Sequence, residues 1–465
     1  MRLLNRLNQY QRLWQPSNGE PQSVTVGELA ERCFCSERHV RTLLKQAQDA
    51  GWLEWHAQSG RGKRGQLRFL VTPDSLRNTM MEQALQKGEQ LSVLELAQLA
   101  PGELRTLLQP FMGGQWQNDT PTLRIPYYRP LDPLHPGFLP GRAEQHLAGQ
   151  VFSGLTRFDS TTQRPCGDLA HHWNISADGL RWDFYIRSTL HWHNGDTVSS
   201  TQLHQQLLKL LELPALNKLF ISVKHIEVTH PQCLTFILHR PDFWLAHRLA
   251  SYSSHLAHPE HPFVGTGPFR LTLFTPELVR IESHDHYHLS HPLLKAIEYW
   301  ITPQLFSQDL GTSCRHPVQI AIGKPEELPM LSQVSSGISL GFCYLTLRKS
   351  ARLNTQQARR LVDIIHRSSL LQTLEVDENL ITPSNALLPG WSIPQWDELD
   401  EVALPEKLTL AYHLPVELHA MAEQLCHALA LLGCELTLIF HNAKNWDGNH
   451  PLAQADLMMG DRLIG

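Results

Sequence analysis

The chain has 465 residues, which is longer than one ordinary domain, and we expect two or three domains. Hydrophobic residues make up 42% of it, which supports substantial cores and excludes a largely disordered protein. No apolar run approaches membrane-spanning length, the N-terminus lacks the apolar core of a secretion signal, and the net charge is −5. Eight scattered cysteines show neither a disulfide framework nor a four-cysteine zinc pattern. We therefore expect a cytoplasmic protein without a membrane partner.

Three helices are predicted within the first 51 residues. The helix over residues 1–14 has apolar residues at helical spacing, namely Leu3, Leu4, Leu7 and Leu13 or Trp14. Thr25 and Glu28 have the capping-box spacing that begins a second helix, with the apolar stripe Leu29, Ala30 and Cys33. Ser36 suits the N-cap of a third helix, which Gly51 ends. The inward positions of this third helix are Val40, Leu43, Leu44 and Ala47.

The outward face of the third helix is mainly basic and polar. It carries Glu37, Arg38, Arg41, Thr42 and Lys45, with His39 near its edge. Residues 53–57 and 67–71 then alternate like strands, and the loop between them contains three cations. A helix, a turn, an exposed basic helix and a basic hairpin are the pattern of a winged helix-turn-helix that binds double-stranded DNA. The predicted contacts, in the major groove and from the wing to phosphate, are Arg38, His39, Arg41, Thr42, Lys45, Arg61, Lys63 and Arg64.

Charge is distributed unevenly along the chain. Residues 1–72 contain 11 Lys/Arg and 6 Asp/Glu, a net charge of +5, whereas the whole chain carries −5. Cations concentrated on one small domain of an acidic protein are typical of nucleic-acid binding. The alternative is a small helical packing module with a solvated basic face. Fold pattern and charge agree, so we favour DNA binding.

The rest of the chain is predicted to form a helical connector and a large α/β domain. Residues 73–118 have helical spacing and form the connector, and the large domain covers residues 119–465. Strands and helices are mixed over this length, which indicates more than one lobe. Predicted helices cover residues 143–155, 198–212, 355–370 and 416–432, and predicted strands cover residues 221–229, 233–239, 338–347, 407–413, 434–440 and 457–459, the last followed by a charged turn.

From about residue 122 the chain resembles the family 5 extracytoplasmic solute-binding proteins, whose members include oligopeptide, dipeptide and nickel receptors of transporters. The matching segments, in order, are residues 150–157, 168–173, 176–180, 182–187, 193–195, 265–269, 358–365 and 455–457. Each segment is weak alone, but their order and spacing over more than three hundred residues are specific. A winged helix fused in front of such a domain is similar to the SgrR family of transcriptional regulators.

This resemblance implies a multidomain fold, with a winged helix-turn-helix followed by a two-lobed α/β domain like the class II periplasmic binding proteins. Lobe I would cover about residues 119–297 and lobe II about residues 298–465. The implied function is a transcriptional regulator that senses a small cytoplasmic solute; the alternative is a peptide or nickel receptor of an ABC uptake transporter. Family members return from lobe II to complete lobe I, so we expect the C-terminus to be truncated, and an inert remnant that binds DNA is a third possibility.

A ligand pocket is expected between the two lobes, because concave sites form at domain interfaces. The effector would be a peptide or a sugar-like or phosphorylated metabolite. Each candidate side chain has core packing as its alternative role. The candidates are Tyr127, Arg129, Trp192, Trp391, Trp446 and Asp461.

Two further motifs suggest other chemistry. His284, His286 and His288, with His291 nearby, would share one face of a strand and could bind a soft metal. The alternative is an ordinary exposed segment, and we predict neither a metal nor a cofactor. The segment 265–268 looks like a phosphate loop but lacks its lysine and following helix, so a turn between lobes is the better interpretation. No motif supports enzymatic activity.

Overall fold

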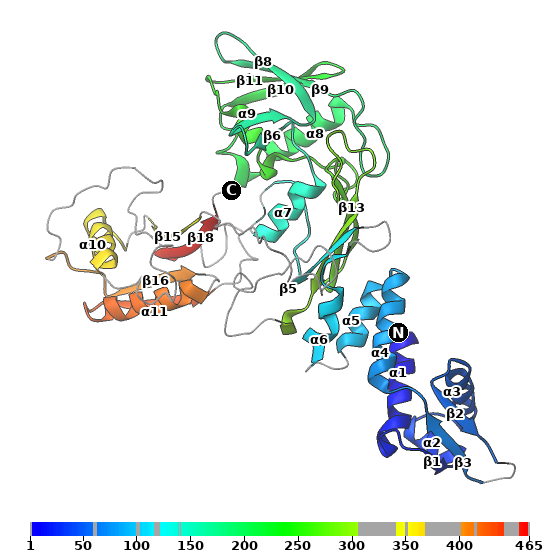
Figure 1. The fold of residues 1–465 in the computed structure, drawn as a ribbon. Coiled ribbons are helices and arrows are strands. Elements are labelled where there is room, and N and C mark those ends of the chain that lie inside the picture. Colours follow the sequence, from blue (N-terminus) through cyan, green and yellow to red (C-terminus); the bar gives the residue numbers. More distant parts are fainter. Residues whose placement is uncertain are drawn as a thin grey trace, which may run out of the picture. The chain divides into compact units, whose positions relative to one another are not determined.

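The computed structural model describes residues 2–58, 63–98, 103–115, 121–137, 139, 141–305, 341–348, 352–367, 401–412, 416–440 and 455–463 (Figure 1). The chain divides into two compact units, and each is described by itself. Unit 1 contains Met1–Gln115 and Thr302–Leu305, and unit 2 contains Trp116–Ile301 and Phe306–Gly465. Among the described residues, no helix is both long and apolar enough to cross a bilayer.

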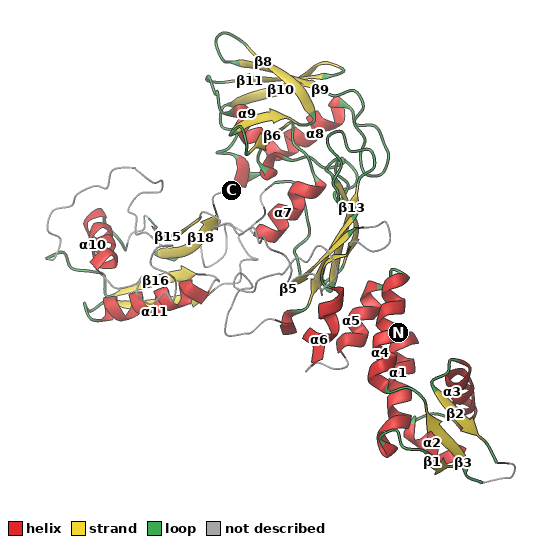
Figure 2. Cartoon of the chain, viewed as in Figure 1, coloured by secondary structure: helices red, strands yellow, loops and turns green. Residues whose placement is uncertain are grey.

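Unit 1 is mainly helical, with a small sheet at one end (Figure 2). Its elements are α1 (Arg2–Trp14), η1 (Gln15–Ser17), β1 (Gln22–Val24), α2 (Val26–Arg32), α3 (Glu37–Asp49), β2 (Leu53–His56), β3 (Gly65–Phe69), α4 (Pro73–Gln86), α5 (Gln90–Gln98), α6 (Leu104–Leu108), η3 (Gln109–Phe111), β4 (Gly113–Gln115) and η6 (Pro303–Leu305). The three helices and two strands predicted in the first 71 residues are therefore confirmed. β1 was not predicted.

The predicted helix caps are confirmed in detail. Glu28 N donates to Thr25 Oγ1 at 3.2 Å, and Thr25 N donates to Glu28 Oε2 at 2.8 Å, so α2 begins with a complete capping box. Ser36 Oγ accepts from His39 N at 3.3 Å at the start of α3. Gly51 follows this helix with φ +72°, a conformation that glycine adopts without a Cβ penalty.

The first part of unit 1 is a winged helix. Its sheet has the order β1-β3-β2, and both pairs are antiparallel. β3 begins two residues before the predicted strand because β1 pairs with Gly65–Leu67. The fully buried side chains of its core come from every helix and from the hairpin: Leu7, Leu29, Val40, Leu53 and Leu67.

Residues 73–115 form part of this compact unit, whereas the sequence suggested a separate connector. α4 and α5 pack against each other and against α1, which also contacts α2. α4 buries Leu76, Met80 and Met81 and therefore needs an apolar partner. α1 supplies one, so this helix is common to the winged helix and to the helices that follow it.

The first half of unit 2 contains two larger sheets and a hairpin. β12 (Phe269–Phe274), β13 (Leu278–Ser283), β14 (Ala296–Ile301) and β5 (Thr122–Tyr127) lie side by side in this order, with α7 (Arg142–Val151) packed on β12. The predicted lobe boundary at residue 297 falls within β14, which pairs in parallel with β5.

The second sheet has the order β10 (Val223–His230), β11 (Cys233–Leu238), β9 (Arg181–Ile186) and β8 (Ala170–Ile175). α8 (Ser200–Leu211) packs on β10 and β11, and the remaining elements are β6 (Thr156–Asp159), β7 (Arg164–Gly167), η4 (Pro214–Leu216), α9 (Leu245–Leu249) and η5 (Tyr252–Ser254).

The second half of unit 2 has a sheet in the order β15 (Gly341–Leu347), β18 (Leu457–Leu463), β16 (Lys407–Tyr412) and β17 (Glu435–Phe440). α11 (Val416–Ala430) packs on the last three of these strands, and α10 (Thr355–Arg367) contributes Leu361 to the same core. The charged turn predicted after Met459 is wrong. β18 continues to Leu463 because it pairs residue for residue with β15.

Candidate functional site

The solvent face of α3 is the strongest candidate for a binding surface. Val40, Leu44 and Ala47 are buried and fix the helix against the core, so the opposite positions point to solvent. Five of the predicted DNA-contacting residues lie there and are exposed: Arg38, His39, Arg41, Thr42 and Lys45. Four of them, with Gln46 and Asp49, line one open depression along the helix.

Two columns of side chains run along this face, because residues four positions apart are neighbours on a helix. One column is Glu37, Arg41 and Lys45, and the other begins with Arg38 and Thr42. Arg41 Nη2 donates to Glu37 Oε2 at 2.8 Å, and the two side chains are 60% and 55% exposed. Thr42 Oγ1 donates to the Arg38 carbonyl at 3.2 Å. The guanidinium of Arg41 is therefore in contact with the Glu37 carboxylate on the solvent face of α3.

The base of the wing is attached to α2. Arg64 Nη2 donates to Glu28 Oε1 at 2.5 Å, and Arg64 Nη1 donates to the Ser23 carbonyl at 3.4 Å. The Thr25 N–H, and then the nearby Arg64 guanidinium, hold the pKa of Glu28 below its ordinary value. Lys63 is exposed, whereas the predicted contact Arg61 lies outside the described residues.

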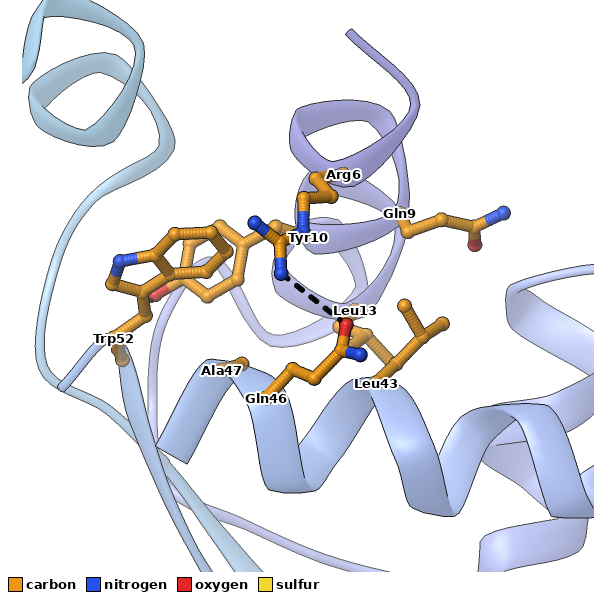
Figure 3. Close-up of a pocket in the computed structure, with 8 residues that line it drawn as sticks. All are labelled: Arg6, Gln9, Tyr10, Leu13, Leu43, Gln46, Ala47 and Trp52. Carbon is orange, nitrogen blue, oxygen red and sulfur yellow. Dashed lines mark hydrogen bonds between the residues drawn. The ribbon is translucent and has the colours of Figure 1, made fainter. Parts of the chain in front are cut away.

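A small crevice behind α3 shows how the helix is supported (Figure 3). Arg6 Nη2, from α1, donates to Gln46 Oε1 at 3.4 Å, and the ring of Tyr10 meets the edge of Trp52 at 5.9 Å between centroids. The crevice has a volume of about 20 Å³, room for a water molecule and not for a larger ligand. It is lined by Arg6, Gln9, Tyr10, Leu13, Leu43, Gln46, Ala47 and Trp52.

Tyr10 is a support residue that the sequence interpretation missed. Its hydroxyl lies 2.8 Å from the Trp52 carbonyl and 2.6 Å from the Val71 carbonyl, so it joins both ends of the wing hairpin to α1. Burial raises the pKa of Tyr10 to about 12. Its position three residues after Leu7 and four before Trp14 was the signal that placed it on the inward face.

In unit 2, Arg129 is engaged in a buried ion pair. Its Nη1 and Nη2 donate to the two oxygens of Glu144 at 2.6 and 2.9 Å, and the Glu144 side chain is 1% exposed. Burial alone would raise the pKa of Glu144, but the Arg129 hydrogen bonds and the Asp132 N–H hold it below its ordinary value. The guanidinium also lies 5.7 Å from the Tyr127 ring centroid. Arg129 thus anchors the first turn of α7.

The other predicted ligand contacts have different positions. Trp192 is fully buried in the core beneath β9 and β11 and donates to Gln202 at 3.3 Å. Its complete burial favours the alternative role in core packing. Tyr127 is half-buried and packs edge-on against Tyr299. Trp391 and Trp446 lie outside the described residues, and Asp461 is placed only by its backbone in β18.

The histidine segment forms a turn after β13, so the three rings do not share the face of a strand. His284 packs on His193 at 4.7 Å between ring centroids, and His286 packs on His191 at 5.3 Å. His288 Nε2 instead lies 2.7 Å from Asp168 Oδ1. Within the described part of the chain, no group of three or more His, Cys, Asp or Glu side chains is arranged to bind a metal ion.

The segment 265–268 lies against the end of α7, and its two glycines stand where no Cβ would fit. A Cβ at Gly265 would stand 2.0 Å from the Val151 carbonyl oxygen, and one at Gly267 would stand 2.4 Å from the Gln150 oxygen. His193 fixes the segment, since its Nδ1 accepts from Gly265 N at 3.2 Å and its Nε2 lies 3.0 Å from the Gly267 carbonyl. These contacts join the segment to the end of α7 and to His193 in the first half of unit 2.

Comparisons with known proteins agree with this architecture. The family model described as "Sugar transport-related sRNA regulator N-term" matches residues 5–119, and the model "Bacterial extracellular solute-binding proteins, family 5 Middle" matches residues 164–308. A solved structure of the periplasmic binding protein DppA from Helicobacter pylori in complex with the peptide STSA is 16% identical, with a TM-score of 0.58. That match covers 74% of this chain and 78% of DppA. At this identity the likeness shows the fold alone.

Several relatives match over almost the whole chain, and two of them are described here. The Escherichia coli (strain K12) protein YbaE is 80% identical over 465 residues, covering 100% of this chain and 82% of that protein. The HTH-type transcriptional regulator SgrR of Yersinia pseudotuberculosis serotype I (strain IP32953) is 30% identical over 473 residues, covering 97% of this chain and 81% of that protein. A small α+β domain followed by a family 5 solute-binding-protein fold is therefore present. The chain belongs to the SgrR family.

Proposed function

We propose that this protein is a DNA-binding transcriptional regulator that senses a small cytoplasmic solute through its solute-binding-protein-like domain. The observation that carries the proposal is the exposed face of α3, with Arg38, Arg41 and Lys45, in a winged-helix unit with a net charge of +5 over residues 1–72. The SgrR relative, named as an HTH-type transcriptional regulator, supports the same role. The partner is double-stranded DNA, without chemistry on the DNA itself.

In this role α3 enters the major groove and the wing contacts the adjacent backbone. Arg38, Arg41, Thr42 and Lys45 face base edges or neighbouring phosphates, with His39 at the edge of the contact. The wing contacts phosphate through Arg61, Lys63 and Arg64. Each cation that neutralises a phosphate releases condensed counterions, so the affinity for DNA falls as the salt concentration rises. Arg64 must first leave Glu28 or share its guanidinium between Glu28 and a phosphate, because the two are in contact in the free protein.

The second domain supplies the regulation. A solute changes DNA binding only if it binds the DNA-competent and DNA-incompetent states with different affinities. The fold shared with a peptide-binding protein supports a peptide as effector, and a sugar-like or phosphorylated metabolite is the alternative. Tyr127 remains a proposed ligand contact.

Sequence selection with the purified full chain tests the proposal. We expect enrichment of one DNA site from a random duplex pool, and we expect affinity for that site to fall steeply with salt. The triple change Arg61→Ala, Lys63→Ala and Arg64→Ala should weaken binding to all sequences and flatten the salt dependence. Failure of the wild-type chain to bind any duplex at low salt would overturn the proposal.

The second candidate is a receptor component of an uptake transporter, which the solute-binding-protein fold favours. Such a receptor would bind its solute in the absence of DNA and would have no preference for any DNA sequence. Cell fractionation separates the two roles, because a receptor is exported whereas a regulator fractionates with the nucleoid.

A further inference from the structure

The solvent face of α3 carries an acid at each end, Glu37 as the first residue of the helix and Asp49 as the last, and Glu37 is the one in contact with a cation of that face. Glu37 is exposed and stands one turn before Arg41 and two turns before Lys45. A carboxylate in this place repels DNA phosphates, so it lowers non-specific affinity. Residues near the start of a recognition helix contact base edges, so Glu37 is located where sequence is read.

The fold gives only a modest reason for this carboxylate, namely the weak stabilisation of an acid by the dipole in the first turn of a helix. Ser36 already caps α3 through the His39 N–H, and an exposed ion pair between residues i and i+4 adds little to stability. Gly27 of α2 faces the carboxylate, since a Cβ there would lie 3.7 Å from Glu37 Oε1. A Cβ at position 27 would make an ordinary van der Waals contact with the carboxylate, so the position of Glu37 does not require the glycine.

The contact with Arg41 gives the carboxylate a specific geometric effect. Glu37 Oε2 accepts one hydrogen bond from Arg41 Nη2 at 2.8 Å, which restrains a long side chain that would otherwise sample many rotamers. A guanidinium has five N–H donors, so one bond to Glu37 leaves four. Two of those four suffice for the paired contact to guanine O6 and N7, the commonest specific contact of arginine in the major groove.

We infer that Glu37 is the positioning residue that makes Arg41 a reader of guanine, and that it increases sequence discrimination while lowering general affinity for DNA. The inference rests on the proposed function and names one residue pair within the same surface. Glu37 orients the guanidinium, and Arg41 contacts the base. The two effects of Glu37 are separable by experiment, because its charge lowers general affinity for DNA whereas its positioning of Arg41 raises discrimination.

The test compares specific and non-specific binding of the full chain, using the duplex selected by the wild-type protein and a scrambled duplex at the same salt. Glu37→Gln removes the charge and keeps the size of the side chain. We expect tighter binding to the scrambled duplex and a fall of about twofold in the ratio of specific to non-specific affinity, the size that an exposed ion pair of this kind can supply. Glu31→Gln, an exposed acid of α2, is the matched control, and its ratio should equal that of the wild type.

A double-mutant cycle identifies the route through Arg41. Adding Glu37→Gln to an Arg41→Ala background should cause no further loss of discrimination, because the residue to be positioned is absent. An equal further loss would mean that Glu37 reads DNA independently, which overturns the positioning role. An unchanged ratio for Glu37→Gln alone overturns the inference and leaves the proposed function intact, whereas a wild-type chain that binds no duplex overturns the proposed function itself.

Discussion

Replacing Arg129 by methionine should strongly destabilise the region around α7, because it leaves the Glu144 carboxylate buried without its guanidinium partner. Removing one member of a buried ion pair costs about 3–5 kcal/mol. Glu144 keeps the Asp132 N–H at 2.9 Å, and the Arg129 side chain is itself 21% exposed. We therefore expect the lower end of that range, about 3 kcal/mol.

The loss should depend on pH with a defined sign. In the wild type the pKa of Glu144 lies below its ordinary value, so its contribution is present above the unfolded pKa and is lost as pH falls through the folded pKa. In Arg129→Met, burial acts without the guanidinium and raises the pKa of this carboxyl. The side chain then becomes neutral at a higher pH than in the wild type, and the deficit of the variant should shrink as pH falls.

Hydrogen exchange of the α7 amides is the appropriate assay, because it reports the free energy of opening of this one helix in the full chain. Arg181→Met is the matched control, since it removes an exposed arginine paired with Asp183 in the same unit. The control should leave α7 exchange unchanged. Equal protection of α7 in Arg129→Met and in the wild type, or a deficit that grows as pH falls, would refute the reasoning.

Three further predictions concern other parts of the structure. Trp192→Ala should lower the free energy of unfolding, measured by urea denaturation, by about 3–5 kcal/mol, because the ring is fully buried. An unchanged free energy of unfolding would favour the prediction that Trp192 lines a pocket. Tyr10→Phe should lower the free energy of unfolding of unit 1 by about 1–3 kcal/mol, since the single O–H that lies between the Trp52 and Val71 carbonyls is lost. Burial lowers the pKa of His193 to about 3 and that of His284 to about 4, so their stabilisation is complete above about pH 6.5 and is lost progressively as pH falls towards about 3. The urea midpoint should therefore decline over that range, and less steeply in His284→Asn.

The elements that the sequence predicted well are those whose signals are local. The capping box of Thr25 and Glu28 and the glycine at position 51 depend on contacts within a few residues, so α2 and α3 were located almost to the residue. β1 was missed because three residues carry no readable periodicity, and its strand character comes from pairing with β3. The length of β18 similarly depends on β15, more than a hundred residues earlier in the chain.

The candidate sites were predictable to the extent that they are built from single elements. The exposed face of α3 follows from helical spacing alone, so its residues could be named in advance. The partners of His288 and Arg129 could not, because Asp168 lies 120 residues from His288 and Glu144 is on a different element from Arg129. Trp192 was assigned to a pocket because the sequence shows that a residue is aromatic but not how deeply the fold buries it.

The most direct test of the central claim is the salt dependence of DNA binding by the full chain, with Arg38→Ala, Arg41→Ala and Lys45→Ala combined and compared with the wild type. The account predicts that the wild-type chain binds a selected duplex with a steep negative dependence on salt. The triple variant should lose the preference for that duplex. The slope of its log affinity against log salt concentration should also be smaller by up to about 3, about 1 for each cation that contacts a phosphate. A variant that retains wild-type affinity, sequence preference and salt slope would contradict the claim that the solvent face of α3 is the DNA-binding surface.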